Sequence, residues 1–466
     1  MNEATLFLMK PELSLMLFLF ILLIGKVGDW FKTNESVMNL VHGLLVVQLG
    51  ICLIPGTGEA FSGMYRTHTL IGFEKLILTA GTLLISLQSW HWARNHKHLP
   101  EFYILLFTTL LGFYFMLSSG NFLMFYLALE LASIPLAALV NFDLDKAKSS
   151  EAAVKMILIS AFASSMMLFG ISFVYGTTGS LQFDQLPQLI NGGQLQMMAL
   201  IFIFSGFAFK LSAVPFHLWT ADVYEGAPVA VTAYLSVISK AATVFVFISI
   251  LSPLFQFFPA LWNHLLEWVI VLTICVGNLF ALRQTNIKRF LAFSSIAQVG
   301  FILLAFVAGN ADGSASGIFF LVVYLFSNLG AFGVVSIVSA QTGHEDLVHY
   351  KGFYRHHKTL GWVMALSLFS LAGVPPTAGF FGKMFLVASG AAAGNYFLLL
   401  IAALNMVVSL YYYLRIVKFM FVDEQEHHMI LQPAHYTVML ALFICMAGVL
   451  LTGVVPGLYA YIQSLL

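Results

Sequence analysis

The stretch FKLSAVPFH, residues 209–217, decides the fold class, because it places a lysine and a proline inside an otherwise apolar segment. A second stretch, LAGVPPTAGF at residues 371–380, repeats the pattern, and Lys383 lies just beyond it. Proline removes an amide donor and clashes with the preceding turn, and carbonyls left unpaired at bilayer depth need protein or water partners. Proline kinks that serve only packing are one explanation. A lysine close to each break instead favours the paired interruptions that mark transporter sites.

Seven charged residues, including the two lysines above, lie in segments whose apolar character predicts membrane-spanning helices. They are Lys75, Lys155, Lys210, Lys240, Lys383, Glu74 and Glu130. A charge at bilayer depth costs roughly 3 kcal/mol on insertion scales, and such residues usually face a protein interior or a hydrated cavity. The pattern is typical of a membrane protein that moves ions or protons.

The composition excludes a soluble globule. Of the 466 residues, 60% are hydrophobic and only 9% are charged, against about 25% charged residues in soluble domains. The balance of 21 basic and 21 acidic residues argues against a nucleic-acid partner. The cysteines, Cys52, Cys275 and Cys445, are far apart in apolar runs, so we expect no metal or iron–sulfur site.

Apolar stretches of about 20 residues, the length that crosses a bilayer, predict an all-α polytopic membrane protein with about fourteen transmembrane helices. We expect these helices near residues 12–31, 36–55, 68–92, 101–118, 121–142, 151–176, 197–217, 227–251, 262–283, 289–309, 316–340, 360–389, 393–421 and 436–463. The connections are short, so residues 1–466 are expected to form a single transmembrane domain. The seventh and twelfth helices carry the two prolines and are expected to be broken.

The basic residues of the connections predict the orientation, because cytoplasmic loops are rich in lysine and arginine. One side has Lys10 and Arg66, and the other has Lys26, Lys32, Arg94, Lys97, Lys146, Lys148, Arg283, Lys288, Arg289, Lys351, Arg355, Lys358, Arg415 and Lys418. An even number of spans returns the chain to the side on which it begins, which is the side with few basic residues. We therefore expect both termini to lie outside the cytoplasm. In a bacterium, the chain would be a multi-pass protein of the inner membrane with periplasmic termini.

The two broken helices are five spans apart. Because successive spans cross the membrane in opposite directions, two repeats of five helices would have opposite orientations in the membrane. We predict that helices 4–8 (residues 101–251) and 9–13 (residues 262–421) form inverted repeats. The segments 1–92 and 436–466 would flank them. Sequence similarity between the halves is slight, little beyond AVP at 213–215 and GVP at 373–375.

The buried charges suggest individual roles. Glu130 lies in the middle of the fifth helix, and it is either a protonated packing residue or an ion partner, with Lys210 as the best candidate. Lys240, with serine neighbours, and Lys383 are expected to take part in proton transfer. Lys155 is near a helix end, so its ammonium group could simply extend to the membrane surface. This explanation is an alternative to a functional role. Glu74 and Lys75 are adjacent in sequence and do not face each other on a helix.

Three further residues follow the first break. His217 is a possible proton relay because its ordinary pKa lies near working pH. Asp222 and Glu225 could also relay protons, although a solvated loop explains them equally well. The chain contains no phosphate-binding loop, dinucleotide fingerprint or nucleophile arrangement. We therefore expect no catalytic redox site in this chain, and the energy for transport would come from an ion gradient or from partner subunits.

The run KLSAVPFHLW at 210–219, followed by DVYEGAP at 222–228 and then Lys240, resembles the signature of the antiporter-like proton-translocating subunits of NADH-quinone oxidoreductase, respiratory complex I. The resemblance extends over essentially the whole chain. It implies fourteen helices, inverted repeats and a hydrophilic axis in which Glu130 pairs with Lys210, and Lys240 and Lys383 continue the path. Lys155 would lie on the input side. Ala221 and the Val229-Ala230 pair depart from the usual residues of the family, proline and Thr-Pro.

The resemblance also implies partners. The chain would be a non-redox translocase subunit, bound to other membrane subunits, with NADH, FMN, iron–sulfur clusters and quinone in partner subunits and no cofactor of its own. Alternatives are a subunit of a multi-subunit cation/proton antiporter or of a membrane-bound hydrogenase. From another class, a structural membrane scaffold without transport would use the buried charges only to fix helix packing.

Overall fold

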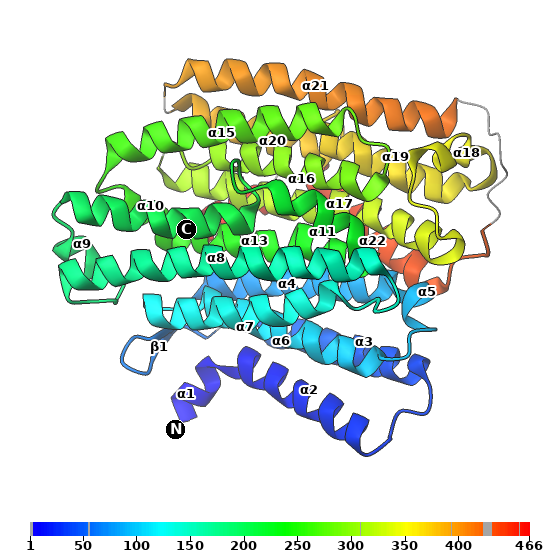
Figure 1. Ribbon diagram of the computed structural model, residues 1–466, viewed down its shortest axis with the longest axis horizontal. Helices are drawn as coiled ribbons and strands as arrows, with labels where there is room; N and C mark the ends of the chain where they lie inside the picture. Colours follow the sequence, from blue (N-terminus) through cyan, green and yellow to red (C-terminus); the bar gives the residue numbers. More distant parts are fainter. Residues whose placement is uncertain (1–2, 55, 308, 393, 423–430, 456) are drawn as a thin grey trace.

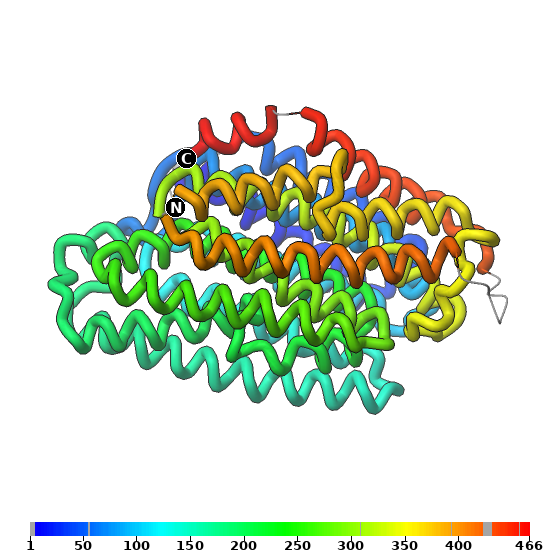
Figure 2. Tube along the Cα trace, turned by 90° about the horizontal axis from the view of Figure 1, so that it is seen from above, coloured from blue at the N-terminus to red at the C-terminus, as the bar shows by residue number. Residues whose placement is uncertain are grey.

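The computed structural model describes residues 3–54, 56–307, 309–392, 394–422, 431–455 and 457–466. Its long helices run side by side in one bundle (Figures 1 and 2). Twelve helices of these ranges are long and apolar enough to cross a membrane. The chain is thus an all-α polytopic protein, as predicted.

The N-terminal flank contains three long helices, two short ones and a small hairpin. Its elements are α1 (Glu3–Leu8), α2 (Lys10–Val27), α3 (Asn34–Cys52), β1 (Gly58–Ala60), β2 (Tyr65–Thr67), α4 (Thr69–Gln88) and α5 (Trp90–Ala93). Strands β1 and β2 pair antiparallel, with Glu59 opposite Arg66. Three-residue strands give little hydrophobic alternation, so the sequence did not predict this hairpin.

The next part of the chain covers the residues of the predicted first repeat. It comprises α6 (Leu99–Leu117), α7 (Phe122–Val140), α8 (Ala147–Thr178), α9 (Leu186–Leu189), α10 (Gln194–Leu211), α11 (Leu218–Gly226), α12 (Val229–Tyr234), η1 (Leu235–Ser239), α13 (Lys240–Val246), η2 (Phe247–Leu251) and α14 (Ser252–Phe255). The elements from α12 to α14 form one continuous helix that includes two π-helical segments, η1 and η2.

The remaining elements cover the predicted second repeat and the C-terminal flank. They are α15 (Pro259–Ala281), α16 (Ile287–Leu304), α17 (Ala311–Thr342), η3 (Leu347–Tyr350), α18 (Phe353–His356), α19 (Lys358–Ala372), α20 (Ala378–Ala392), α21 (Tyr396–Phe421), α22 (Tyr436–Val454) and α23 (Gly457–Leu465). The last predicted span, 436–463, was too long, because α22 ends at Val454. Residues 55, 308, 393 and 456 of the predicted spans lie outside the described residues.

Both predicted breaks are present. Helix α10 ends at a left-handed Ser212 (φ 63°), and α19 ends at a left-handed Gly373 (φ 86°). In each case the chain then passes through the proline segment and starts a new helix, α11 or α20. The interpretation of Asp222 and Glu225 as loop residues was wrong, because both lie in helix α11.

The two halves share further features. The third helix of each predicted repeat, α8 or α17, has 32 residues and ends at a left-handed glycine, Gly179 or Gly343, the usual residue for such a cap. Asparagine side chains cap the starts of α7, α16 and α17 by accepting backbone amide hydrogens. These parallels are consistent with the inverted repeats and with fourteen spans, which stay predictions.

The arrangement of the bundle places the site. The α12–α14 helix, α16 and α17 are almost entirely buried and form its centre. Both termini lie at the end of the bundle that carries the β1–β2 hairpin, whereas α5 and α18 lie at the opposite end (Figures 1 and 2). We call these the hairpin end and the basic end, since the second contains Arg94 of the α5 connection and Arg355 of α18.

Candidate functional site

Lys240 lies at the centre of the bundle, directly after the π-helical segment η1. Its side chain is buried, and Nζ donates to Ser295 Oγ of α16 at 2.6 Å. The same Nζ lies 5.8 Å from the centre of the Tyr224 ring in α11. Lys240 therefore joins three elements of the core: the α12–α14 helix, α16 and α11.

Lys383 is buried in α20 and turns back toward the break before this helix. Its Nζ donates to the carbonyl oxygens of Leu371 at 2.7 Å and Ala372 at 3.2 Å. The last carbonyls of a helix have no partner within the helix. The break after α19 thus creates the acceptors that hold the Lys383 ammonium group.

One turn of α16 connects the two lysines. Ser295 accepts from Lys240, and Gln298, three residues later, donates to the carbonyl of Leu371 at 3.0 Å and to Tyr413 OH at 3.1 Å. Leu371 is also an acceptor for Lys383. Residues three apart on a helix are neighbours, so Lys240 and Lys383 belong to one polar cluster.

Lys210 lies at the end of α10, beside α7 and α8, and is partly exposed. Its Nζ donates to Ser133 Oγ at 2.5 Å and to Ser160 Oγ at 3.5 Å. Glu130 is one turn before Ser133 on α7 and interacts electrostatically with Lys210, but these two described residues form no hydrogen bond or ion pair within 4 Å. The Glu130 Oε1 atom is buried without a hydrogen-bond partner among the described residues.

Lys155 is 39% exposed and belongs to an ionic cluster with α11. Its Nζ lies 2.7 Å from both Glu151 and Asp222. Arg289 of α16 donates to both Asp222 and Glu225 at 2.8 Å, and Lys148 pairs with Glu225 at 2.8 Å. We call these six residues the α11 ion network.

The electrostatics of the α11 ion network follow from its pairs. Burial alone would raise the pKa values of Asp222 and Glu225. Hydrogen bonds from Lys155 and Arg289 outweigh burial at Asp222, and those from Lys148 and Arg289 do so at Glu225, so both pKa values lie below their ordinary range. Both carboxylates are therefore charged at neutral pH.

His217 lies directly before α11, and its Nδ1 atom is buried without a hydrogen-bond partner among the described residues. It is not a member of the ion network. The structure thus distributes the predicted residues over three groups: Lys240 and Lys383 in the core, Glu130 and Lys210 with Ser133, and Lys155, Asp222 and Glu225 in the α11 ion network. His217 stands apart.

Sequence reasoning missed a partly buried ion pair at the basic end. Lys288, assigned to a connection, lies in the first turn of α16 and is buried; it pairs with Glu345 at 3.0 Å and donates to the carbonyl of Ala227 at 2.9 Å. The two residues line a cavity of about 310 Å³ that also contacts Lys148 and Glu225. In the sequence, Lys288 is followed directly by Arg289, and two adjacent basic residues are typical of a solvated connection.

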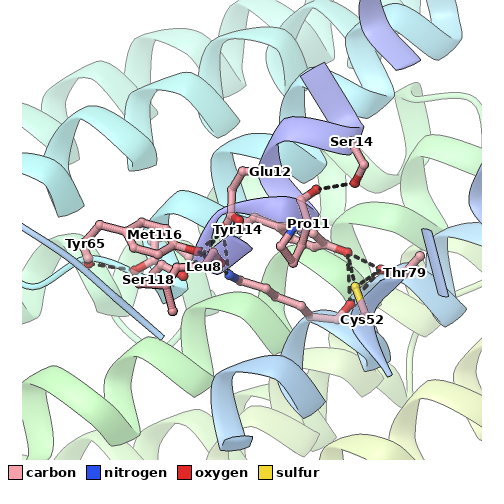
Figure 3. Close-up of polar contacts among 12 residues, drawn as sticks. Leu8, Pro11, Glu12, Ser14, Cys52, Tyr65, Thr79, Tyr114, Met116 and Ser118 are labelled. Carbon is pink, nitrogen blue, oxygen red and sulfur yellow. Dashed lines mark hydrogen bonds and ion pairs between the residues drawn. The ribbon is translucent and has the colours of Figure 1, made fainter. Parts of the chain in front are cut away.

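A second missed pair joins the N-terminal helices. Glu12 of α2 and Lys75 of α4 are both buried, with Nζ and Oε1 2.5 Å apart. Tyr65 of β2 donates to Glu12 Oε2 at 3.0 Å, as Figure 3 shows. Lys75 thus pairs with a residue far away in sequence rather than with its neighbour Glu74. Glu12 lies at the end of its predicted span, where charged residues are common, so its sequence position does not indicate a buried charge.

Comparisons with known proteins agree with this architecture. Residues 119–409 match the family described as "NADH:quinone oxidoreductase/Mrp antiporter, TM". NADH-quinone oxidoreductase subunit N of Azobacteroides pseudotrichonymphae genomovar. CFP2 is 44% identical over 475 residues, which cover 100% of this chain and 98% of that protein. The subunit N of Phocaeicola vulgatus is 44% identical over 90% of both chains.

Solved structures give the same result. A chain of respiratory complex I from Thermus thermophilus superposes with a TM-score of 0.83 at 30% identity, over 96% of this chain and 97% of that chain. A chain of the Mrp complex from Dietzia sp. DQ12-45-1b superposes with a TM-score of 0.84 at 18% identity, over 99% of this chain and 95% of that chain, which shows a shared fold. The chain is therefore a multi-pass membrane protein of the NADH:quinone oxidoreductase/Mrp antiporter family, and its sequence places it with the N subunits of NADH-quinone oxidoreductase.

Proposed function

We propose that this chain is a proton-translocating membrane subunit of NADH-quinone oxidoreductase, and that Lys210, Lys240 and Lys383 hold and release the protons. One observation carries the proposal. In the described part of the chain, these three ammonium groups are held by serine hydroxyls or backbone carbonyls and by no carboxylate within 4 Å. Such a lysine can lose its proton without leaving an unpaired carboxylate behind, whereas arginine stays protonated at any working pH.

Unpaired polar atoms along the axis support a hydrated route. Within the described ranges, Tyr224 OH and Gln298 Oε1 beside Lys240 and Lys383, and Ser164 Oγ and Ser212 Oγ near Lys210, are buried without a hydrogen-bond partner. Buried polar groups pair with protein or with ordered water. Water molecules at these atoms would connect the lysine groups and carry protons between them.

The α11 ion network would receive protons at the basic end and deliver them toward Lys210. Lys155 and Asp222 form a contact between α8 and α11, and α11 also supplies the Tyr224 ring to Lys240. His217, at the start of this helix, would assist the transfer. A change of charge in the α11 ion network would therefore affect both Lys155 and Lys240, because α11 contacts both of these lysines.

NADH oxidation and quinone reduction would take place in partner subunits, which would hold NADH, FMN, iron–sulfur clusters and quinone. The names of the relatives and the complex I structure support membership of a multi-subunit NADH-quinone oxidoreductase. The chain would lie in a bacterial inner membrane, with the hairpin end and both termini on the periplasmic side. The exposed apolar residues beside Glu130 on α7, including Leu127 and Ile134, would face lipid or a neighbouring membrane subunit.

The test is proton translocation by the assembled complex. The Lys240→Arg variant is compared with Lys97→Arg, which changes an exposed lysine, and protons moved into vesicles are measured per NADH oxidised. We expect Lys240→Arg to assemble but to lose translocation by this chain. Normal translocation in Lys240→Arg would favour the scaffold. Sodium-dependent translocation that persists without NADH would favour the cation/proton antiporter.

A further inference from the structure

The Glu12–Lys75 pair is unusual because it lies outside the central axis but is fully buried. Removing two charges from water costs more than their attraction returns unless the geometry is favourable and other hydrogen bonds help. Tyr65 and Ser118 lie near Glu12 (Figure 3). Tyr65 donates to Glu12 at 3.0 Å, Ser118 donates to it at 3.5 Å, and Lys75 Nζ lies 3.4 Å from Tyr65 OH. The pair therefore resembles a built ionisable site rather than an incidental contact between helices.

The site is close to the surface at the hairpin end. Tyr65 lies in β2, and the next residue, Arg66, pairs with the exposed carboxylates of Glu59 and Asp184. Tyr65 also donates to the carbonyl of Leu8 at 3.2 Å. Tyr65, itself buried, thus links the Glu12 carboxylate to the backbone of α1, and the next residue along β2 contacts exposed acidic groups.

Buried hydroxyl groups continue from the pair toward the core. Thr79, one turn after Lys75 on α4, forms a hydrogen bond with Tyr114 OH, and Lys75 Nζ lies 5.5 Å from the Tyr114 ring centre. Thr82 follows on the same helix and donates to the carbonyl of Leu78 at 2.7 Å, and Tyr234 OH accepts from Thr109 of α6 at 3.1 Å. All of these hydroxyl groups are buried.

A second group of hydroxyls lies beside Lys240. Gly81 brings the backbone of α4 against Ile238 of η1, since a Cβ at Gly81 would lie 2.4 Å from Ile238 Cδ1. In η1, Ser236 contacts Tyr324 OH at 3.0 Å and accepts from Asn328 at 2.7 Å. Tyr324 faces both Ser236 and Ser295, the serine that holds Lys240.

We propose that Glu12 and Lys75 form a second proton-transfer site, connected to Lys240 by the hydroxyl groups of α4, α6 and η1. A hydroxyl both donates and accepts, and neighbours one helical turn apart, about 5–6 Å, can be bridged by one water molecule. The proposal rests on the proposed function of the central axis. It adds a connection from that axis to the hairpin end, which the predicted orientation places at the periplasm.

The transfer conserves protons. A proton that Lys240 releases passes along the hydroxyl groups to a neutral Lys75 amine, after that lysine has given its own proton to the Glu12 carboxylate. Glu12 then loses this proton through Tyr65 to the surface, and the carboxylate–ammonium pair is restored. One proton enters and one leaves in each cycle, and no other reactant is needed.

The experiment separates this role from a packing role. The variant Thr79→Val/Tyr114→Phe removes two hydroxyl groups and leaves the ion pair intact. The control, Thr108→Val/Tyr411→Phe, changes a hydroxyl bonded to its own helix at Ile104 and an exposed tyrosine. Protons moved per NADH oxidised are measured in vesicles that contain the assembled complex, beside Lys240→Arg.

We expect Thr79→Val/Tyr114→Phe to assemble and to lose as much translocation as Lys240→Arg, with the control unchanged. A second variant, Glu12→Leu/Lys75→Met, removes both charges and should give the same loss without loss of assembly, since an apolar replacement of a buried pair is tolerated. Normal translocation in both variants, together with a loss in Lys240→Arg, would overturn this proposal alone. Normal translocation in Lys240→Arg would overturn the proposed function.

Discussion

The Lys383 Nζ atom lies 2.7 Å from the carbonyl oxygen of Leu371, an oxygen that also accepts from Gln298. A helix break, a lysine and a glutamine of a different helix therefore meet at one acceptor. In this contact Lys383 pairs a free carbonyl, and substitutions can separate that structural function from the proposed one of carrying a proton.

We expect Lys383→Arg to keep the first function and lose the second. Arginine can donate to the carbonyls of Leu371 and Ala372 but stays protonated. Proton transfer by a positioned side chain contributes about 10²–10⁴-fold to a rate, so proton uptake should fall by that order while the complex still appears on a native gel. Lys97→Arg is the matched control. Wild-type uptake in Lys383→Arg would remove this residue from the route.

Lys383→Met should show the structural function. It leaves the carbonyl of Ala372 without this donor and that of Leu371 with Gln298 alone, and an unpaired buried acceptor costs about 1–3 kcal/mol. A lower unfolding temperature than that of Lys383→Arg is expected, measured by thermal denaturation of the purified complex. Equal unfolding temperatures would show that the carbonyl contacts contribute little.

Glu130 and Lys210 are predicted to act together in proton pumping. Lys210 donates to Ser133 on α7, one turn after Glu130. Glu130→Gln and Lys210→Ala should each reduce proton pumping, and the double variant should lose less than the sum of the two. Glu130 and Lys210 interact electrostatically, and residues coupled in one network give interaction energies of about 0.5–3 kcal/mol in such cycles. Strictly additive losses would show that the two charges act independently.

The α11 ion network should make stability depend on acid pH. The pKa of Asp222 is lowered in the folded state, so its stabilisation is present above the ordinary aspartate pKa and is lost as pH falls through the folded value. The effect should stay below about 1 kcal/mol, because half-exposed pairs are weakened by solvent.

The comparison uses thermal unfolding between pH 6 and pH 3. Asp222→Asn should show a smaller decrease in unfolding temperature than the wild type, whereas Asp145→Asn, at an exposed position, should behave like the wild type. The same decrease in Asp222→Asn and the wild type would contradict the prediction.

Orientation can be measured with single cysteines in a background without Cys52, Cys275 and Cys445. A cysteine beside Arg355, at the basic end, should react with an impermeant reagent only from the cytoplasmic side. One at Glu59, in the hairpin, should react only from the periplasm. The reverse pattern would invert the predicted orientation, and labelling of both from one side would change the number of spans.

Hydropathy predicts most of this fold, because long apolar segments have few alternatives to spanning a membrane. The two helix breaks were also predictable, since proline has a strong local effect at residues 215 and 375. Helix α11 was not, because its nine residues, 218–226, mix polar and apolar side chains without a clear period. The end of α22 was missed because the apolar run continues into α23.

The site was predictable only in part. Lys240 and Lys383 are conspicuous because a lysine in a long apolar run is costly. Their acceptors are not, because serines such as Ser295 and backbone carbonyls occur throughout the chain. Glu12 and Lys75 are 63 positions apart, so their pairing depends on how α2 packs near α4, and no local pattern contains that information.

The π-helical segment Leu235–Ser239 has a consequence for the neighbouring lysine. A π turn holds more backbone than an α turn, and each residue of an α-helix rotates the chain by about 100°. Deleting one residue here would remove the π turn and rotate Ser236 and Tyr234 relative to Lys240, so these side chains could not all keep their present partners, Tyr324, Thr109 and Ser295. The length of this segment is thus constrained as strictly as the lysine itself: losing Ile238 should harm proton transfer more than replacing it with valine.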